Sequence, residues 1–270
     1  MQIQTEEGLV PAKRQIRILD LFCMGAGLTY NIHTPNLKKA REATGGRCPT
    51  VETMNYLAKD PLVFEPSTSY KYSLCHDVLA AVVEIISGMP FTDYVKKNIF
   101  DPLGMANSTF YLDESEWDIV AEQYKFDKEL GHVVNVGKDI QITKIGSEYV
   151  SGGGGCISTT EDYILFLEAM RKGDVLLKKE TTDLMTTNHL NGGQLKNFGH
   201  LGKGYGYGLG VRCPLGNSGV TDFGWSGAGG AYLAIDCVHN ITLFYVQHVL
   251  AAPNRGFRPR IFEYAQKALA

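Results

Sequence analysis

The residues best placed for chemistry are Tyr72 and Ser73, which follow a turn and precede a helix. The turn is indicated by Pro66 and the three small polar residues after it. Apolar residues recur at helical spacing over 78–86, and Gly88 is placed to end that helix. A hydroxyl held at the start of a buried helix can face a cleft, so Tyr72 is a candidate for proton transfer; a tyrosine in an ordinary loop is the alternative.

Residues 65–73, EPSTSYKYS, together with the helix and the Ser-Gly that follow, resemble the tyrosine motif of the β-lactamase-related serine hydrolases. That family includes class C β-lactamases, penicillin-binding proteins of the D-Ala-D-Ala carboxypeptidase type and β-lactamase-like esterases. Its motif reads roughly Pro-Gly-Thr, three residues, then Tyr-Ser or Tyr-Ala-Asn. In this chain Ser67 stands in the place of the glycine and Leu74 in that of the asparagine.

A second motif, Trp225-Ser226-Gly227, resembles the strand motif that lines the pocket in the same family. Penicillin-recognising members have Lys-Thr-Gly or His-Thr-Gly there, whereas related esterases often have Trp-x-Gly. A lysine or histidine would hold the carboxylate of a β-lactam or peptide, but Trp225 offers one N–H and a flat apolar wall. The resemblance therefore implies neutral esters more than penicillins. A glycine-rich bulge in a core strand is the structural alternative.

The resemblance also implies a role for each site residue. Tyr72 would act as general base or proton relay, and the backbone N–H of Ala228 would be one of two donors to the oxyanion. The residues expected to bind the substrate lie on the motif strand, beside the tyrosine or at the rim of the cleft: Leu74, Gly153, Trp225, Ser226 and Gly227.

The nucleophile motif of the family, Ser-x-x-Lys, does not occur in this chain. In the family it lies several dozen residues before the segment that residues 16–28 resemble, which would put it upstream of Met1. We therefore expect a fragment, a truncated product, a protein completed by another chain or a non-catalytic relative. A core without that helix would be marginal, so we also expect a homo-oligomer or a second chain that completes it.

Two other chemistries have weaker support. His76 and Asp77 lie near Ser73, but sequence neighbours at a helix start point in different directions, and no GxSxG elbow is present. The four glycines at 152–155 precede a helix that Ser158 or Thr159 would cap, yet the phosphate-binding pattern GxxxxGK[ST] is absent.

The composition excludes several classes of protein. The 270 residues are 44% hydrophobic and carry 26 basic and 29 acidic side chains, without a long basic run, which argues against nucleic-acid binding. No stretch is apolar enough to span a membrane. Six cysteines without CxxC or paired histidines argue against a metal or other cofactor, and four of them (Cys23, Cys75, Cys156, Cys237) have the apolar or small neighbours of buried thiols. With no visible export signal, we expect a cytoplasmic protein.

The order of the expected elements predicts one α/β (α+β) domain over 1–270, of the β-lactamase/transpeptidase type with its N-terminal part missing. Residues 11–200 would form a mainly helical subdomain, and 201–270 an antiparallel sheet with a C-terminal helix. Strands are expected over 205–211, 221–236 and 241–249, and helices over 51–59, 90–99 and 258–269.

Overall fold

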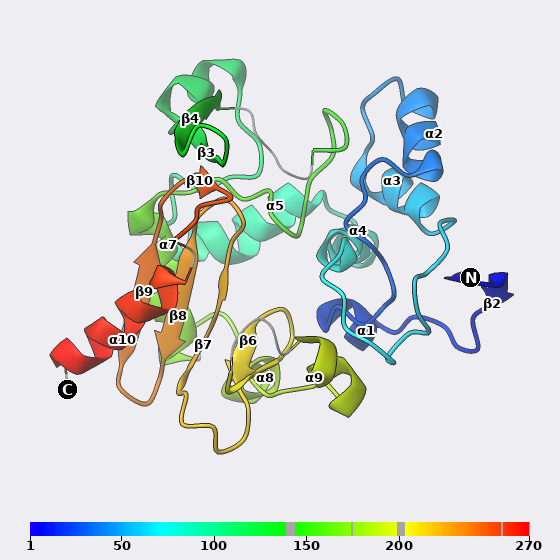
Figure 1. The fold of residues 1–270 in the computed structure, drawn as a ribbon. Coiled ribbons are helices and arrows are strands. Elements are labelled where there is room, and N and C mark those ends of the chain that lie inside the picture. The colour runs from blue at the N-terminus through cyan, green and yellow to red at the C-terminus, as the bar shows by residue number, and fades with distance from the viewer. Residues whose placement is uncertain (139–143, 174, 199–202, 255, 270) are drawn as a thin grey trace.

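The computed structural model describes residues 1–138, 144–173, 175–198, 203–254 and 256–269. Helices from the first part of the chain lie on one side of the molecule and an antiparallel sheet from the last third lies on the other (Figure 1). The α+β architecture predicted from the sequence is thereby confirmed. The predicted subdomain boundary at 200/201 lies outside the described residues.

The helical side is built around α4 (Cys75–Ser87), with α1 (Ile18–Phe22), α2 (Pro35–Ala43) and α3 (Thr50–Leu57) packed near it. The helix begins three residues before the predicted start and ends at Gly88, whose φ of +66° is the left-handed cap that the sequence indicates. The expectation of a fully buried helix is only partly met, because Ile85 and Ile86 near its end are 67% and 80% exposed.

The predicted helix over 90–99 is present but divided. It runs as α5 (Phe91–Val95), a π-helical turn η1 (Lys96–Phe100) and α6 (Asp101–Leu103), which ends at Gly104 with φ +71°. No single described helix is long and apolar enough to cross a membrane; only the bent pair of α4 with 91–103, broken by 81°, passes on length and composition.

The sheet on the other side has the order β5-β6-β7-β8-β9, and every neighbouring pair is antiparallel. Helix α7 (Thr160–Lys172) packs on one face and α10 (Phe257–Leu269) on the opposite face (Figure 1). The predicted cap of α7 is present, since the Thr159 hydroxyl accepts a hydrogen bond from the Asp162 N–H at 3.2 Å. The strands are β5 (Tyr205–Tyr207), β6 (Arg212–Pro214), β7 (Asp222–Ser226), β8 (Tyr232–Asp236) and β9 (Ile241–Tyr245).

All three predicted strands are wrong in extent, since the one expected over 241–249 ends at Tyr245 and Val249 begins the separate strand β10. The strand expected over 205–211 ends at Tyr207, and the one expected over 221–236 is a hairpin of β7 and β8. The hairpin forms because the Gly227 N–H donates to the Ala231 carbonyl at 2.7 Å and closes a turn between them. The second motif therefore lies at the end of a strand and in a turn, and not within a continuous strand.

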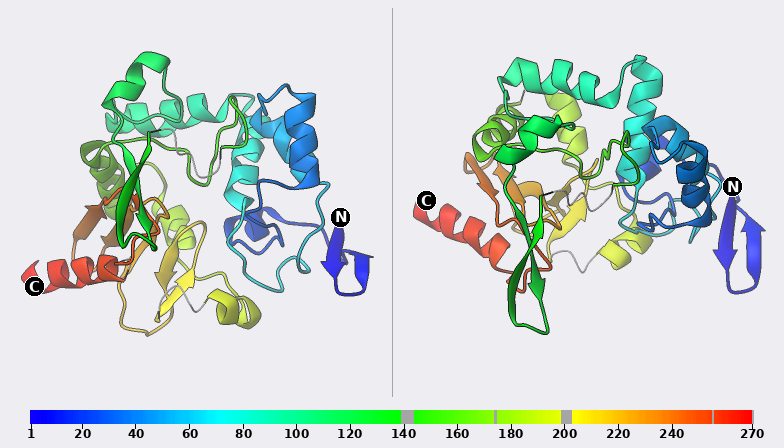
Figure 2. Two further views of the ribbon diagram at one scale, coloured as in Figure 1. Left: turned by 45° about the horizontal axis from the view of Figure 1, so that its top comes forward. Right: turned by 90° about the horizontal axis from the view of Figure 1, so that it is seen from above.

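Two hairpins extend from this body. β3 (Gln123–Asp127) pairs with β4 (His132–Gly137) and, in parallel, with β10 (Val249–Leu250), and this hairpin projects from the body in the right-hand view of Figure 2. β1 (Gln2–Thr5) and β2 (Gly8–Pro11) form a separate hairpin at the N-terminus. The remaining helical elements are α8 (Lys179–Met185), α9 (Gly192–Phe198) and the 3₁₀ turn η2 (Glu114–Ile119).

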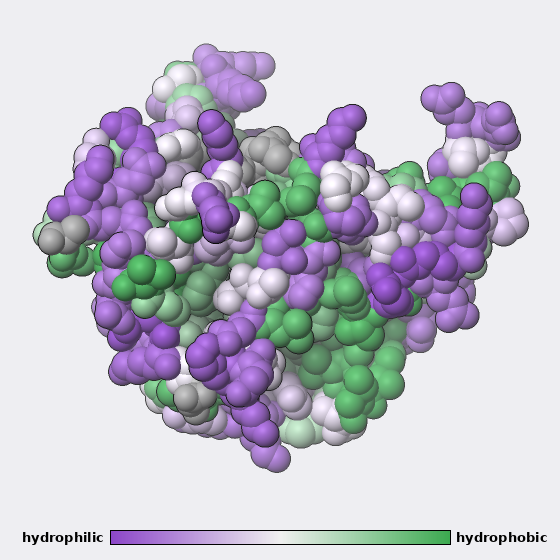
Figure 3. Space-filling view, turned by 90° about the horizontal axis from the view of Figure 1, so that it is seen from below, coloured by the Kyte–Doolittle hydropathy of each residue, from purple (hydrophilic) through white to green (hydrophobic). Residues whose placement is uncertain are grey.

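The largest core cluster joins the two sides of the molecule, because Leu21, Leu37 and Leu74 of the helical part share it with Tyr207 of β5. On the surface, apolar residues are gathered toward one side when the molecule is seen from below (Figure 3). All six cysteines are free thiols. Cys23 and Cys75 are buried as predicted, but Cys156 and Cys237 are exposed because they lie in a loop and a turn.

We predict that Gly224→Ala destabilises the fold much more than Gly88→Ala. Both glycines have positive φ, +153° and +66°, but only a Cβ at Gly224 would meet another strand, 2.2 Å from the Leu233 carbonyl oxygen. Gly88→Ala should lower the free energy of unfolding by roughly 1–2 kcal/mol through backbone strain alone. Gly224→Ala should cost about 3 kcal/mol or more, because β7 and β8 must separate. Urea denaturation of both variants measures this, and equal losses would contradict the prediction.

Candidate active site

Tyr72 and Trp225, one from each motif, stack on each other. Their ring centroids are 5.6 Å apart with an angle of 15° between the planes. Tyr30 stacks on Tyr72 with a centroid distance of 5.4 Å and an angle of 4°. The structure thus brings together the two motifs at the place where the helical part meets β7, and adds Tyr30, which sequence reasoning did not single out.

The environment of Tyr72 favours its neutral phenol. Burial raises the pKa of Tyr72 above its ordinary value, a hydrogen bond with the Trp225 side chain lowers it, and the charge of Asp77 raises it further. The residue is nevertheless 38% exposed, so its hydroxyl group belongs to a side chain that a ligand can reach. No cation among the described residues contributes to this pKa. Tyr72 therefore suits a proton relay better than a resting phenolate base.

A buried carboxylate, Asp77, lies close enough to Tyr72 for its charge to raise the pKa of that residue. It is 0% exposed in the first turn of α4, and its Oδ1 accepts a hydrogen bond from the Tyr149 hydroxyl at 2.9 Å. A Cβ on Gly153 would lie 3.0 Å from Asp77 Oδ2 and 3.6 Å from the Tyr30 hydroxyl. Gly153 is therefore beside the site, as expected for the rim residue, and it must be glycine for the loop to approach this closely.

The motif strand ends in the turn between β7 and β8. Ser226 and Ala228 are exposed there, and Trp225 and Gly227 are half-buried. In the part of the chain that the structure describes, the Ala228 N–H has no hydrogen-bond acceptor, so it is free to donate to a ligand. Arg258 of α10, also not anticipated, holds the turn: its Nη1 donates to Ser226 Oγ at 3.1 Å and to the Gly227 carbonyl at 2.9 Å.

Two residues of the tyrosine motif depart from the expected pattern. Leu74 is completely buried in the largest core cluster, so the prediction that it lines the acyl pocket is wrong for this structure. Ser67 has a φ of +69°, the conformation for which the family motif has glycine. The strain is offset by hydrogen bonds of the Ser67 hydroxyl, which donates to Asp20 Oδ1 and accepts from Arg17 Nη2 at 3.1 Å.

The serine and threonine hydroxyl groups near Tyr72 lack the surroundings of an activated nucleophile. Ser73 is 1% exposed, and its Oγ lies 3.1 Å from Cys75 Sγ. The chain contains one Thr-x-x-Lys, at Thr68 and Lys71. It lies in a turn, where the Thr68 hydroxyl donates to the Glu65 carbonyl at 2.6 Å, so the helix that would place both side chains on one face is absent here.

Neither a histidine triad nor a metal centre is present among residues 1–138, 144–173, 175–198, 203–254 and 256–269. The His76 ring is 3.4 Å from the Phe22 carbonyl, and the adjacent Asp77 carboxylate is bonded to Tyr149. No group of three or more histidine, cysteine or carboxylate side chains could hold a metal ion in these segments.

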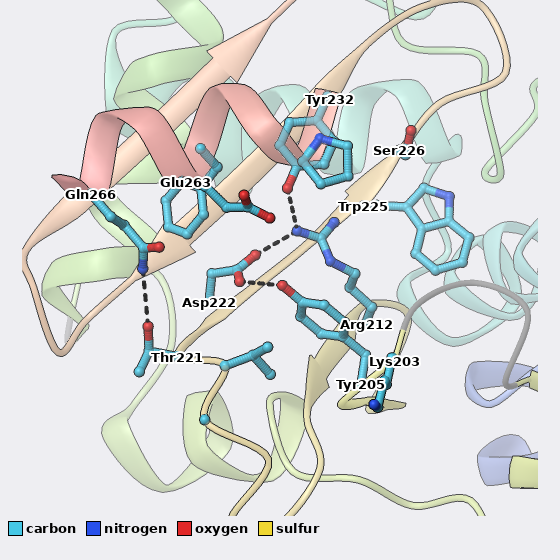
Figure 4. A pocket seen from close by; sticks show the side chains of 14 residues that line it. Lys203, Tyr205, Arg212, Thr221, Asp222, Trp225, Ser226, Tyr232, Glu263 and Gln266 are labelled. Atoms are coloured by element: carbon cyan, nitrogen blue, oxygen red, sulfur yellow. Dashed lines mark hydrogen bonds and ion pairs between the residues drawn. The ribbon is translucent and has the colours of Figure 1, made fainter. Parts of the chain in front are cut away.

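A cavity of about 480 Å³ lies on the sheet face beside α10 (Figure 4). Its centre is the buried ion pair between Arg212 Nη2 and Asp222 Oδ2, 2.5 Å apart, and Arg212 also donates to the Tyr232 hydroxyl at 2.9 Å. Trp225 and Ser226 line its edge. Because the single buried cation is neutralised by Asp222, this cavity is part of how α10 packs on the sheet and carries no distinctive ligand chemistry.

The chain is similar to known proteins over most of its length. The family model described as Beta-lactamase matches residues 6–264. Protein Rv1367c of Mycobacterium tuberculosis is 28% identical over 258 residues, which cover 88% of this chain and 64% of that protein. Lovastatin esterase of Penicillium rubens is 28% identical over 187 residues, covering 67% of this chain and 46% of its own. The chain thus spans 64% or less of these relatives.

Among solved structures, unliganded simvastatin synthase (LovD) of Aspergillus terreus has the same fold. Its TM-score is 0.76 at 22% sequence identity, and the superposition covers 98% of this chain and 73% of that chain.

We predict opposite effects for two buried tyrosines near the site, Tyr207 and Tyr149. The Tyr207 hydroxyl has no hydrogen-bond partner within the described residues, so Tyr207→Phe should leave the free energy of unfolding at pH 7 unchanged or raise it by about 1 kcal/mol. Tyr149→Phe removes the hydrogen bond to the Asp77 carboxylate and should cost roughly 1.5–3 kcal/mol.

The Tyr207 hydroxyl should also affect how the free energy of unfolding depends on pH, which a purely steric effect would not do. Burial raises the pKa of Tyr207 well above its ordinary value, so its contribution is fully present below the unfolded pKa of about 10 and is lost as the pH rises above it. Tyr207→Phe should therefore flatten the loss of stability between pH 9 and 11, measured by urea denaturation. Destabilisation by Tyr207→Phe at pH 7 would show that its hydroxyl has a partner.

Proposed function

The chain belongs to the β-lactamase family, and on this premise we propose that it forms the tyrosine and oxyanion part of a serine ester hydrolase or acyltransferase. The observation that supports this most is the stacking of Tyr72 on Trp225, with the unpaired N–H of Ala228 three residues along the same strand and turn. The nucleophile would be a serine in a Ser-x-x-Lys motif, which residues 1–270 do not contain.

The roles follow from the groups present. Tyr72, a phenol with a raised pKa, passes a proton between the attacking hydroxyl and the leaving group. Ala228 donates to the oxyanion, a contact whose loss typically costs roughly 2.7–4 kcal/mol of transition-state stabilisation. The exposed Ser226 and the half-buried Gly227 border the acyl group. Trp225 supplies an apolar wall where a cationic residue would select an anionic substrate. Neutral esters are therefore the proposed substrates, a class that agrees with lovastatin esterase among the relatives.

The second candidate function is a binding or regulatory protein that keeps the cleft without the chemistry. It is favoured by one observation: the serine nearest Tyr72, Ser73, is buried and turned toward sulfur atoms. Both candidates predict that a neutral acyl ligand binds next to Trp225, and they differ in whether a covalent acyl-enzyme can form.

A partner is also proposed. The end of α4 exposes Ile85 and Ile86, beside the half-buried Val82 and Val83. Apolar side chains of this size gain roughly 1.5–3 kcal/mol each when they are fully buried. We propose that a second chain, or a second copy of this one, covers this side of α4 and completes the core.

We predict that residues 1–270 alone are not covalently labelled by a fluorophosphonate or penicillin probe and show no burst with p-nitrophenyl esters. Groups that only bind and polarise leave a residual advantage of about 10³–10⁴-fold over water, which is too small for a working esterase. Labelling is measured by intact-mass spectrometry. Stoichiometric labelling of this chain would show that its nucleophile has been misplaced.

The enzymatic proposal is tested in a form that includes a Ser-x-x-Lys segment. That form should be labelled, and Tyr72→Phe should lower kcat by about 10²–10⁴-fold, the range for general acid–base groups, without changing the melting temperature by more than a few degrees. Lys71→Ala, an exposed neighbour, is the control and should leave kcat unchanged. If the native reading frame encodes no such segment, the binding function is the one to retain.

We predict that the isolated chain associates through the apolar side of α4. Ile86→Lys should shift the sedimentation profile toward monomer, whereas Ile119→Lys, at a residue 83% exposed in η2, should not. A wild-type chain that is monomeric and melts cooperatively at an ordinary temperature would contradict the proposal of a completing partner.

A further inference from the structure

Asp77 is the only carboxylate that the described residues place next to Tyr72, and the family motif does not account for it. It occupies the first turn of α4, five residues after Tyr72, and is fully buried. A carboxylate this deep requires hydrogen-bond donors, because its desolvation is otherwise costly. One donor is the Tyr149 hydroxyl at 2.9 Å from Oδ1.

The other oxygen of Asp77 faces the glycine-rich loop 151–155. A Cβ on Gly153 would be 3.0 Å from Oδ2, and the side chain of Ser151 and the backbone of Gly153 both favour the ionised carboxylate. Oδ2 and Ser151 Oγ nevertheless lack a full hydrogen bond within the described residues. Oδ2 thus lies against the loop and keeps unused acceptor capacity within the described residues.

The space beside Gly153 also borders Tyr30, which stacks on Tyr72. The position of a Gly153 Cβ is 3.6 Å from the Tyr30 hydroxyl, and the Tyr30 ring lies parallel to that of Tyr72. Asp77 is therefore connected to Tyr72 through the turn that begins α4, and it shares with Tyr30 the space beside Gly153 that a side chain there would fill.

We propose that Asp77 is a positioning residue of the site, whose carboxylate holds the glycine loop 151–155 and the Tyr30–Tyr72 pair in place. It does not touch the substrate and acts through these groups. The inference rests on the proposed role of Tyr72 as proton relay, but its test measures Tyr72 itself and needs no turnover.

The electrostatic part of this role depends on all the groups that face the two residues. Besides Asp77, the titratable groups facing Tyr72 are the phenols of Tyr30, Tyr70 and Tyr207. Asp77 also faces Tyr149 and Cys75. Since the phenols and the thiol are neutral below pH 9, Asp77 is the one charge here that can change how readily Tyr72 ionises at lower pH.

The first experiment titrates tyrosine ζ-carbons by ¹³C NMR in the full chain, with Tyr72 assigned by its disappearance in Tyr72→Phe. Asp77→Asn keeps the shape and removes the charge, so the pKa of Tyr72 should fall by about half a unit or more. Tyr149→Phe is the matched control, because it removes a contact of Asp77 but keeps its charge, and should move the Tyr72 titration by less than about 0.2 unit. An unchanged Tyr72 titration in Asp77→Asn would overturn the proposal.

A second measurement avoids any variant that fails to fold. In the wild-type chain the Asp77 carboxyl carbon is followed on acidification together with the ζ-carbons of Tyr30 and Tyr72. Burial raises the pKa of Asp77 above its ordinary value of about 3.9, so a shared midpoint above that value is expected in all three signals. Tyrosine signals that stay flat through the Asp77 midpoint would refute the coupling, whether or not the chain proves to be part of an enzyme.

Discussion

The site depends on one contact between rings, the stacking of Tyr72 on Trp225. A stacked aromatic pair contributes only about 0.5–1.5 kcal/mol beyond the area it buries, so it cannot hold the helical part and the sheet together alone. It is supported from behind by Tyr207, whose ring meets Trp225 edge-on at 5.3 Å and Tyr70 at 5.6 Å. The core stabilises the junction, and the outer stack places the Tyr72 side chain there.

Glycine is the second requirement of this junction, because the backbone of loop 151–155 lies directly on α4. A Cβ at Gly152 would be 2.5 Å from the His76 carbonyl oxygen and 2.8 Å from Ala80 Cβ. These glycines serve close packing against a helix. The loop therefore needs no bound phosphate to explain its composition, and its position brings Ser151 and Gly153 to Asp77.

The sequence was informative where a role depends on residue type at one place in the chain. The helix cap at Gly88 and the cap of α7 could be predicted in this way, because turn-forming residues and apolar periodicity are local signals, whereas Tyr72 and Trp225 were chosen by the family resemblance. The α+β class followed from the order of such elements. The turn that divides β7 from β8 was missed because its glycines, Gly227, Gly229 and Gly230, were assigned to the motif strand.

Apart from the meeting of the two motifs, which the family resemblance implied, contacts between distant segments could not be predicted. Arg258 reaches Ser226 across 32 residues, and nothing in the local sequence of α10 indicates this. Tyr30 and Tyr149 are likewise recognisable only once the chain is folded. Asp77 is recognisable in the sequence as an acidic residue in the first turn of an otherwise mostly apolar helix, but beside His76 it was considered only as a member of a triad. Leu74 was assigned to the pocket by its place in the motif, and its burial shows that the backbone turns it into the core.

The charges around Tyr72 limit what this part of the chain can do chemically. A phenol acts as a base at neutral pH only where a cation stabilises its anion, and the described residues instead place Asp77 near it.

The chain thus supplies a neutral hydroxyl, an apolar wall and a backbone donor, all suited to receive and stabilise an acyl group. Among the residues that the structure describes, no positive charge affects the pKa of Tyr72. In the proposed enzyme, that charge and the attacking oxygen must come from the same additional segment, because a lysine that lowers the pKa of Tyr72 must also lie within reach of the serine.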